Sequence, residues 1–180
     1  MRKPLLLLIF VLVVQEIIAK ESQMYELIGF IENNSDYSYT GTPLPTVQVM
    51  SNESICKEFK LTYPCDIAGY YDNRTDLIVI ATTPTGGMVE ENFYEVVLIH
   101  ELVHYLQWHN GYYDVVECKQ QLEADAFRLQ DEYVDHMGYD PANKNDPLFA
   151  LMASMCRGQS GYISGGCLLY TSDAADDTDS

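Results

Sequence analysis

The stretch VVLIHELVHYLQWHNG, residues 96–111, places ionisable side chains in a run that is otherwise mostly apolar. It contains three of the four histidines of the chain and a single glutamate, Glu101. The valines, leucines and isoleucine around them are typical of a helix that is covered by protein on most sides. Histidine and glutamate in such a helix cost free energy unless they are paired or bound to a metal.

The stretch includes the pattern H-E-x-x-H, formed by His100, Glu101 and His104. Residues four apart lie one turn apart on the same face of a helix, so the two imidazoles can hold one Zn²⁺. The glutamate between them projects beside the metal, where it can take a proton from the attacking water. We therefore expect His100 and His104 to be zinc ligands and Glu101 to be the general base of a hydrolase.

The third ligand must come from outside this stretch. In the metzincin pattern a glycine follows the second histidine by three residues and a third histidine follows it by six, but Gln107 and Asn110 occupy those positions. His109 is one residue out of register, so this class is disfavoured and His109 is not expected to bind the metal.

The gluzincin pattern takes a glutamate from a second helix further along the chain. The segment QLEADAFRLQDEY, residues 121–133, provides Glu123 in a sequence with helical apolar spacing. The small Ala124 and Ala126 beside it would let two helices approach closely. Glu123 is therefore the expected third ligand.

HELVHYLQ followed by LEADAFRLQ resembles the gluzincin metallopeptidases, especially the minimal single-domain ones. It also resembles an uncharacterised family of secreted bacterial proteins that carry HELVH-x-LQ followed by L-E-x-E-A-aromatic-x-x-Q. The resemblance covers roughly residues 70–133. It implies a zincin-like fold, His100, His104 and Glu123 as the ligands of Zn²⁺, and Glu101 as the general base.

The sequence departs from the gluzincin pattern at one position. Many gluzincins place an aspartate four residues after the ligand glutamate, where it supports a histidine, whereas Phe127 stands four residues after Glu123. Two alternatives follow. Asp125 could support a zinc-ligand histidine in a different geometry, or Glu117 or Asp125 could replace Glu123 as the ligand.

Peptide hydrolysis also needs a second donor for the developing oxyanion and a surface for the substrate. The candidates for the donor are His136, Tyr133, Tyr112 and Tyr113. Residues 79–81, which lead into the loop 82–87, could form an edge strand that pairs with an extended peptide, as in the gluzincins. The alternative is that this strand is only structural. The expected partner is a peptide or protein substrate.

The two ends of the chain are expected to lie outside the folded domain. Residues 1–19 have a basic start, an apolar run and a small residue, Ala19, which is typical of a cleaved signal peptide; an uncleaved anchor is the alternative. Residues 167–176 resemble a translated sequencing adapter, so residues 167–180 are expected to be non-native; a genuine acidic tail is the alternative. Residues 20–166 then form one metallopeptidase domain, secreted or periplasmic, with no stable membrane association after cleavage.

The net charge of −17 argues against nucleic acid and anionic membranes as partners. Of the five cysteines, Cys167 falls in the suspected tail, and the other four suggest two disulfides. We favour Cys56–Cys65, which closes a small loop, and Cys118–Cys156, which ties two late helices together. A structural zinc site is the alternative, although no C-x-x-C pair exists.

The pattern of apolar residues and turn signals predicts an α+β domain with a short, partly antiparallel sheet packed on the active-site helix and the glutamate helix. The expected helices cover residues 20–33, 52–59, 90–109, 116–137 and 149–155, and the expected strands lie at 45–50 and within 67–81. We expect a secreted zinc-dependent metallopeptidase. The alternatives are a non-catalytic zinc-containing binding or adaptor domain, and a structural domain held mainly by disulfides.

Overall fold

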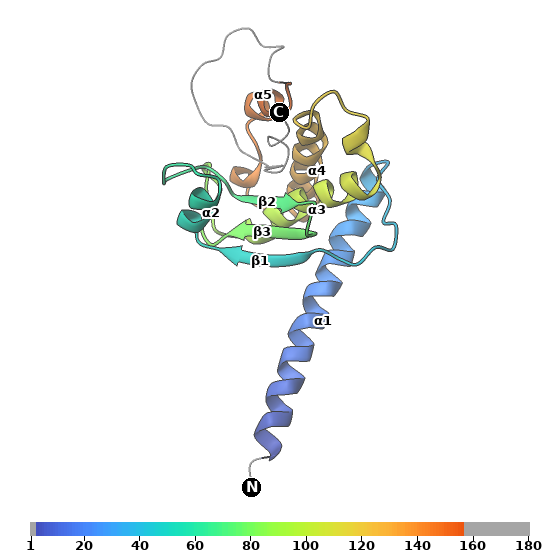
Figure 1. Cartoon of the computed structure of the whole chain (residues 1–180), viewed down its shortest axis with the longest axis vertical. Helices are drawn as coiled ribbons and strands as arrows, with labels where there is room; N and C mark the ends of the chain where they lie inside the picture. The colour runs from blue at the N-terminus through green and yellow to red at the C-terminus, as the bar shows by residue number, and fades with distance from the viewer. Residues whose placement is uncertain (1–2, 157–180) are drawn as a thin grey trace.

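The computed structural model describes residues 3–156. The predicted tail, residues 167–180, lies outside the described residues. The chain is α+β, as predicted (Figure 1). Its elements follow in the order α1 (Lys3–Asn34), β1 (Thr46–Met50), α2 (Asn52–Glu58), β2 (Gly69–Asp72), β3 (Leu77–Ala81), α3 (Phe93–His109), η1 (Tyr112–Asp114), α4 (Gln121–Met137), η2 (Pro141–Asn143) and α5 (Pro147–Ala153).

The sheet has three strands in the order β1-β3-β2. β1 runs parallel to β3, and β2 runs antiparallel to it, with Gly69 opposite Ile80 and Tyr71 opposite Ile78. The prediction that residues 79–81 form an edge strand is wrong, because they belong to the central strand β3. The reason is that β1, although distant in sequence, pairs with β3 on the side opposite β2. β3 therefore has a neighbour on each side, and β2 lies at an edge of the sheet.

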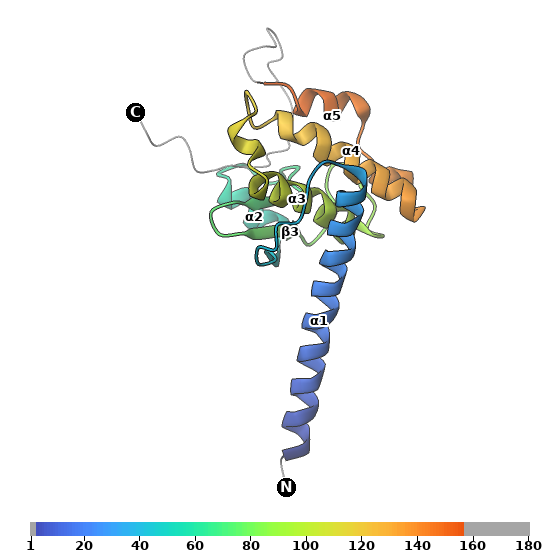
Figure 2. The same cartoon turned by 90° about the vertical axis from the view of Figure 1, so that its right-hand side faces the viewer.

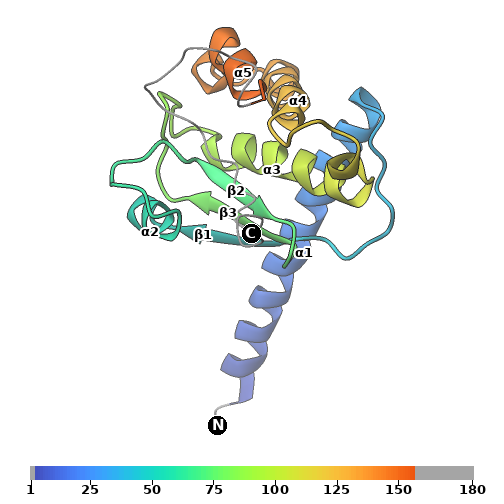
Figure 3. The ribbon, with the colours of Figure 1, turned by 45° about the horizontal axis from the view of Figure 1, so that its top comes forward.

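Helix α3 is the centre of the molecule. It packs against β2 and β3 on one side and against α4 on the other, so the fold is built in layers from the sheet through α3 to α4 and α5 (Figure 3). α1 also contacts α3 and α4 through its C-terminal part, where Leu27, Ile28 and Ile31 are buried. Its N-terminal part extends away from the rest of the chain (Figure 2). Most of α3 is therefore buried, which explains its nearly continuous apolar sequence.

Three of the later predicted helices begin at residues other than those expected. α3 starts at Phe93 rather than at residue 90, because Asn143 holds the backbone of Val89 and Glu91 in a loop. α4 starts at Gln121 rather than at residue 116, after a turn that contains Cys118. α5 spans Pro147–Ala153 rather than residues 149–155, because the Asp146 side chain caps it and proline suits the first turn. The helix expected over residues 20–33 forms part of α1, and the proposed cleavage after Ala19 stays a prediction.

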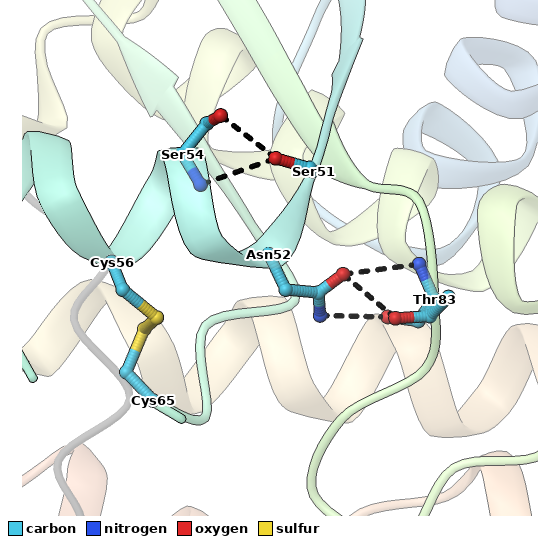
Figure 4. Close-up of a disulfide and its surroundings, with 6 residues drawn as sticks. All are labelled: Ser51, Asn52, Ser54, Cys56, Cys65 and Thr83. Carbon is cyan, nitrogen blue, oxygen red and sulfur yellow. Dashed lines mark hydrogen bonds between the residues drawn. A yellow bond between two sulfur atoms is a disulfide. The ribbon is translucent and has the colours of Figure 1, made fainter. Parts of the chain in front are cut away.

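Both predicted disulfides form, Cys56–Cys65 and Cys118–Cys156, which rules out a structural zinc site built from these cysteines. The first links α2 to the segment that follows it (Figure 4). At the start of the same helix, Ser51 caps α2 and the Asn52 side chain forms hydrogen bonds with Thr83. The second joins the turn before α4 to Cys156, three residues after the end of α5. Disulfides are compatible with an oxidising, extracellular-type compartment. None of the helices within residues 3–156 combines the length and apolar character that a membrane crossing requires.

Candidate metal centre

His100 and His104 project from the middle of α3 toward α4. Both side chains are buried, and their Nε2 atoms lie 3.2 Å apart. The helical spacing of four residues sets this arrangement, because it stacks the two rings one turn apart on one face. The H-E-x-x-H pattern therefore presents two imidazole nitrogens to a single point inside the protein.

Glu123, in the first turn of α4, completes the cluster. Its Oε2 lies 3.3 Å from His100 Nε2 and its Oε1 lies 3.5 Å from His104 Nε2. Among residues 3–156 these three side chains form the one group of three or more potential ligands whose donor atoms all lie within 4.8 Å of one another. A tetrahedral zinc ion with ligand bonds of about 2.0–2.2 Å holds its ligand atoms roughly 3.3–3.6 Å apart. The distances from each histidine to its nearer Glu123 oxygen lie in this range, so the residue types and their spacing are compatible with such an ion. The chemistry of the cluster does not by itself select zinc over other divalent metals.

The electrostatics of the cluster are those of a buried ion pair. Burial would lower the pKa of His104, but the charge of Glu123 and its hydrogen bond outweigh burial and raise that pKa to about 9. Burial would raise the pKa of Glu123, but the two histidines hold it at about 2. A metal ion binding here must therefore displace a proton from His104 at neutral pH.

Glu101 lies beside the cluster with its carboxylate between α3 and β2. One interaction comes from the backbone N–H of Tyr71, which donates to the carboxylate. The other oxygen, Oε2, is buried and has no hydrogen-bond partner among the described residues. Burial raises the pKa of Glu101. A buried carboxylate oxygen without a partner costs free energy, which is the kind of departure from full pairing that occurs at functional sites.

Gly69 allows β2 to approach Glu101 this closely. A Cβ atom added at Gly69 would lie 2.6 Å from Val97 Cγ1, 2.8 Å from the carbonyl oxygen of Val79 and 3.3 Å from Glu101 Oε1. Any side chain would push the strand away from α3. The glycine thus fixes the distance between the sheet edge and the carboxylate.

Each cluster histidine faces a buried glutamine. Gln107 Oε1 lies 2.8 Å from His104 Nδ1, while its Nε2 donates to the carbonyl of Leu122 at 2.9 Å. Gln130 Oε1 lies 2.9 Å from His100 Nδ1, while its Nε2 donates to the carbonyl of Asn143 at 3.3 Å. The carbonyls fix which end of each amide faces the ring, because only the NH₂ group can donate to them. Each Nδ1 must therefore be the donor, which leaves each Nε2 to face the cluster.

Phe127 explains the departure from the gluzincin pattern. Its ring packs against the His100 ring, with centroids 4.8 Å apart, and it fills the place expected for a supporting aspartate. The support of His100 instead comes from Gln130, seven residues after Glu123 and on the same face of α4. Asp125 does not contact either histidine directly, and its Oδ2 accepts a hydrogen bond from Tyr37.

The other candidates from the sequence lie away from the cluster. Glu117 and Asp125 are not part of it. His136 is exposed at the end of α4, where it packs against Phe30, and Tyr133 donates to Glu95. Tyr112 and Tyr113 pack against other aromatic rings, those of Tyr37 and Trp108. His109 pairs with Asp76 at 3.0 Å. The prediction that His109 takes no part in the cluster agrees with this position.

Sequence reasoning missed Gln107, Gln130, Gly69 and Tyr37 as parts of the site. A signal for the two glutamines was present: each follows a leucine, and each lies at a helical spacing from a candidate ligand, three residues after His104 or seven after Glu123. Gly69 and Tyr37 carry no such signal, because their roles depend on contacts between segments far apart in the chain.

Comparisons with known proteins place these residues within one family. No curated protein and no solved structure matches the chain. A family match covers residues 18–160, which is well over half of the chain and includes the cluster and the residues that contact it. The chain therefore belongs to the family described as Domain of unknown function (DUF6647).

Proposed function

We propose that the chain is a secreted zinc-dependent metallopeptidase of the gluzincin type. His100, His104 and Glu123 would hold the metal, and Glu101 would be the general base. The observation that carries this proposal is the position of Glu101 Oε2, a buried carboxylate oxygen without a described partner beside a buried cluster of three ligand atoms. A purely structural metal site has no use for such a group.

A bound zinc ion would supply Lewis-acid activation of water and stabilisation of negative charge at the scissile carbonyl. Glu101 would accept the proton of the attacking water at Oε2 and deliver it to the leaving amine. Its raised pKa suits both steps, because a carboxylate with a pKa closer to neutrality exchanges protons more readily near neutral pH. The N–H of Tyr71 would keep the carboxylate oriented throughout.

The substrate surface proposed here is the edge of β2 rather than residues 79–81. Within residues 3–156, β2 has a strand neighbour on one side only. The bond from Ala81 N to Ala68 O sets the alternation of the ladder, so the backbone groups of Gly69 and Tyr71 point away from β3. Because the Tyr71 N–H is taken by Glu101, an extended peptide would pair with the Gly69 groups and the Tyr71 carbonyl at this edge, and it would lie beside Glu101.

The alternative is a non-catalytic zinc-containing binding or adaptor domain. One observation favours it: the side chains predicted to stabilise an oxyanion, such as Tyr133 and His136, contact other partners away from the cluster. Secretion or a periplasmic location is part of the proposal under both functions, because it rests on the signal-like residues 1–19 together with the disulfides.

The test uses the purified chain with its disulfides formed. Zinc content is measured by elemental analysis, and cleavage of unfolded casein is measured with and without a chelator. We expect one zinc per chain and chelator-sensitive cleavage in the wild type, zinc without cleavage in Glu101→Gln, and no change in the matched control Glu117→Gln. Zinc without wild-type cleavage would support the alternative function, and absence of zinc would overturn both.

A further inference from the structure

The glutamine that faces His104 is held by a chain of hydrogen bonds that crosses three segments. Gln107 Nε2 donates to the hydroxyl of Tyr37 at 3.0 Å as well as to the carbonyl of Leu122. Tyr37 follows α1, and its hydroxyl donates to Asp125 Oδ2 on α4 at 2.8 Å. Gln107 and Tyr37 are buried, whereas Asp125 reaches the surface and pairs with Arg128.

Each bond in this chain has one direction. The carboxylate of Asp125 accepts, so the proton of the Tyr37 hydroxyl points toward it, and a lone pair of that hydroxyl faces Gln107. Both N–H groups of the Gln107 amide are then used, one by Tyr37 and one by Leu122. The amide oxygen can only face His104 Nδ1, which donates to it and leaves Nε2 to face the cluster.

We propose that Tyr37 is a positioning residue of the metal centre: held by Asp125, it acts together with the Leu122 carbonyl to keep the Gln107 amide in the orientation that makes His104 a ligand. This inference rests on the proposed metal binding, but not on peptide cleavage. It means that the segment between α1 and β1, which is distant in sequence from α3, completes the surroundings of the site.

The main test is Tyr37→Phe, which removes one hydroxyl and keeps the ring that packs against Tyr112. We expect its zinc affinity, measured by competition with a chelator, to fall by about 10–100-fold, the usual cost of changing an outer partner of a metal ligand. The matched control is Tyr39→Phe, in the same segment, whose hydroxyl donates to the carbonyl of Thr42 instead. Its zinc affinity should stay at the wild-type value.

A second readout separates positioning from general loosening. In the proton NMR spectrum of the zinc-loaded protein, the Nδ1–H signals of the two histidines report on their own glutamines. Tyr37→Phe should shift the His104 signal or broaden it by exchange with solvent, and leave the His100 signal unchanged. Equal changes in both signals would indicate a merely structural role and overturn the inference.

A second variant keeps the inference testable if Tyr37→Phe does not fold. Asp125→Asn replaces a carboxylate, which can only accept, with an amide that can also donate, at a partly exposed position. Arg128→Gln keeps the carboxylate and removes the ion pairs of Arg128 with Asp125 and Glu132 and its bond to the Asn34 carbonyl. We expect weaker zinc binding in Asp125→Asn than in Arg128→Gln. Wild-type affinity in both Tyr37→Phe and Asp125→Asn would overturn the inference and leave the proposed function standing, whereas a wild-type chain that binds no zinc would overturn both.

Discussion

His104 and His100 lie one turn apart on α3, yet the amides that face their Nδ1 atoms are anchored in different ways. Gln107 lies on α3 itself and is held through Leu122 and Tyr37, ending at a charged group, Asp125. Gln130 lies on α4 and is held by one bond, 3.3 Å long, to the backbone of Asn143. We call these two sets of contacts the His104 arm and the His100 arm.

The difference shows that equivalent ligands need not have equivalent surroundings. The His104 arm links α3, α4 and the segment after α1. The His100 arm links α4 to the loop before α3, because Asn143 also accepts from the N–H of Val89 and donates to the carbonyl of Glu91. Substitutions in the two arms should therefore differ in their effects on stability and on metal binding.

The largest effect is expected at Glu123, because its carboxylate contacts both histidines. Glu123→Gln keeps the size of the side chain but removes the charge that pairs with both histidines. We expect loss of stoichiometric zinc, a greater effect than the roughly 10–100-fold cost of changing an outer partner. Elemental analysis after gel filtration checks this. Full zinc content in Glu123→Gln would show that the ligand is another residue.

The two glutamines provide the next comparison. Gln107→Ala would leave His104 Nδ1 without its partner in a fully buried place and remove the bonds to the Tyr37 hydroxyl and the Leu122 carbonyl, so we expect a loss of about 3 kcal/mol in the free energy of unfolding of the zinc-free protein. Gln130→Ala breaks fewer bonds and should cost about 1–2 kcal/mol. Urea unfolding of both variants measures the difference. A greater cost for Gln130→Ala would contradict the ranking of the two arms.

The smallest effect concerns the proton on the His104 arm. Because the pKa of His104 is raised to about 9, its ring is protonated at pH 7 before a metal binds, and the bound metal must replace that proton. Zinc affinity should therefore fall as the pH is lowered from 9, with at least about one proton released per zinc at pH 7. Calorimetry in buffers of different ionisation enthalpy measures this number. Binding without proton release would show that Glu123 does not raise the pKa of His104.

Features that depend on local spacing could be predicted from the sequence. The position of His100 and His104 on one face of α3 follows from helical geometry. The strands at residues 46–50, 69–72 and 77–81 follow from the alternation of apolar and polar residues and from turn signals. Glu123 could be chosen because the second long helix carries it beside small residues. Both cysteine pairings agree with the prediction.

Features that depend on tertiary contacts could not be predicted in this way. The order of the strands depends on the pairing of β1 with β3, which are far apart in sequence. The start of α3 depends on Asn143, about fifty residues later. The role of Tyr37 arises only when its hydroxyl meets Gln107 and Asp125, which come from two other helices. No pattern within a single segment contains that information.

X-ray absorption at the zinc edge on the purified chain tests directly whether His100, His104 and Glu123 hold a zinc ion. We predict one zinc per chain with four nitrogen or oxygen ligands at about 2.0–2.2 Å, two of them with the outer-shell scattering of imidazole. Glu101→Gln should keep this spectrum, because Glu101 is not a ligand. A spectrum with sulfur ligands, with fewer than two imidazoles, or with a changed ligand set in Glu101→Gln would contradict zinc binding by His100, His104 and Glu123.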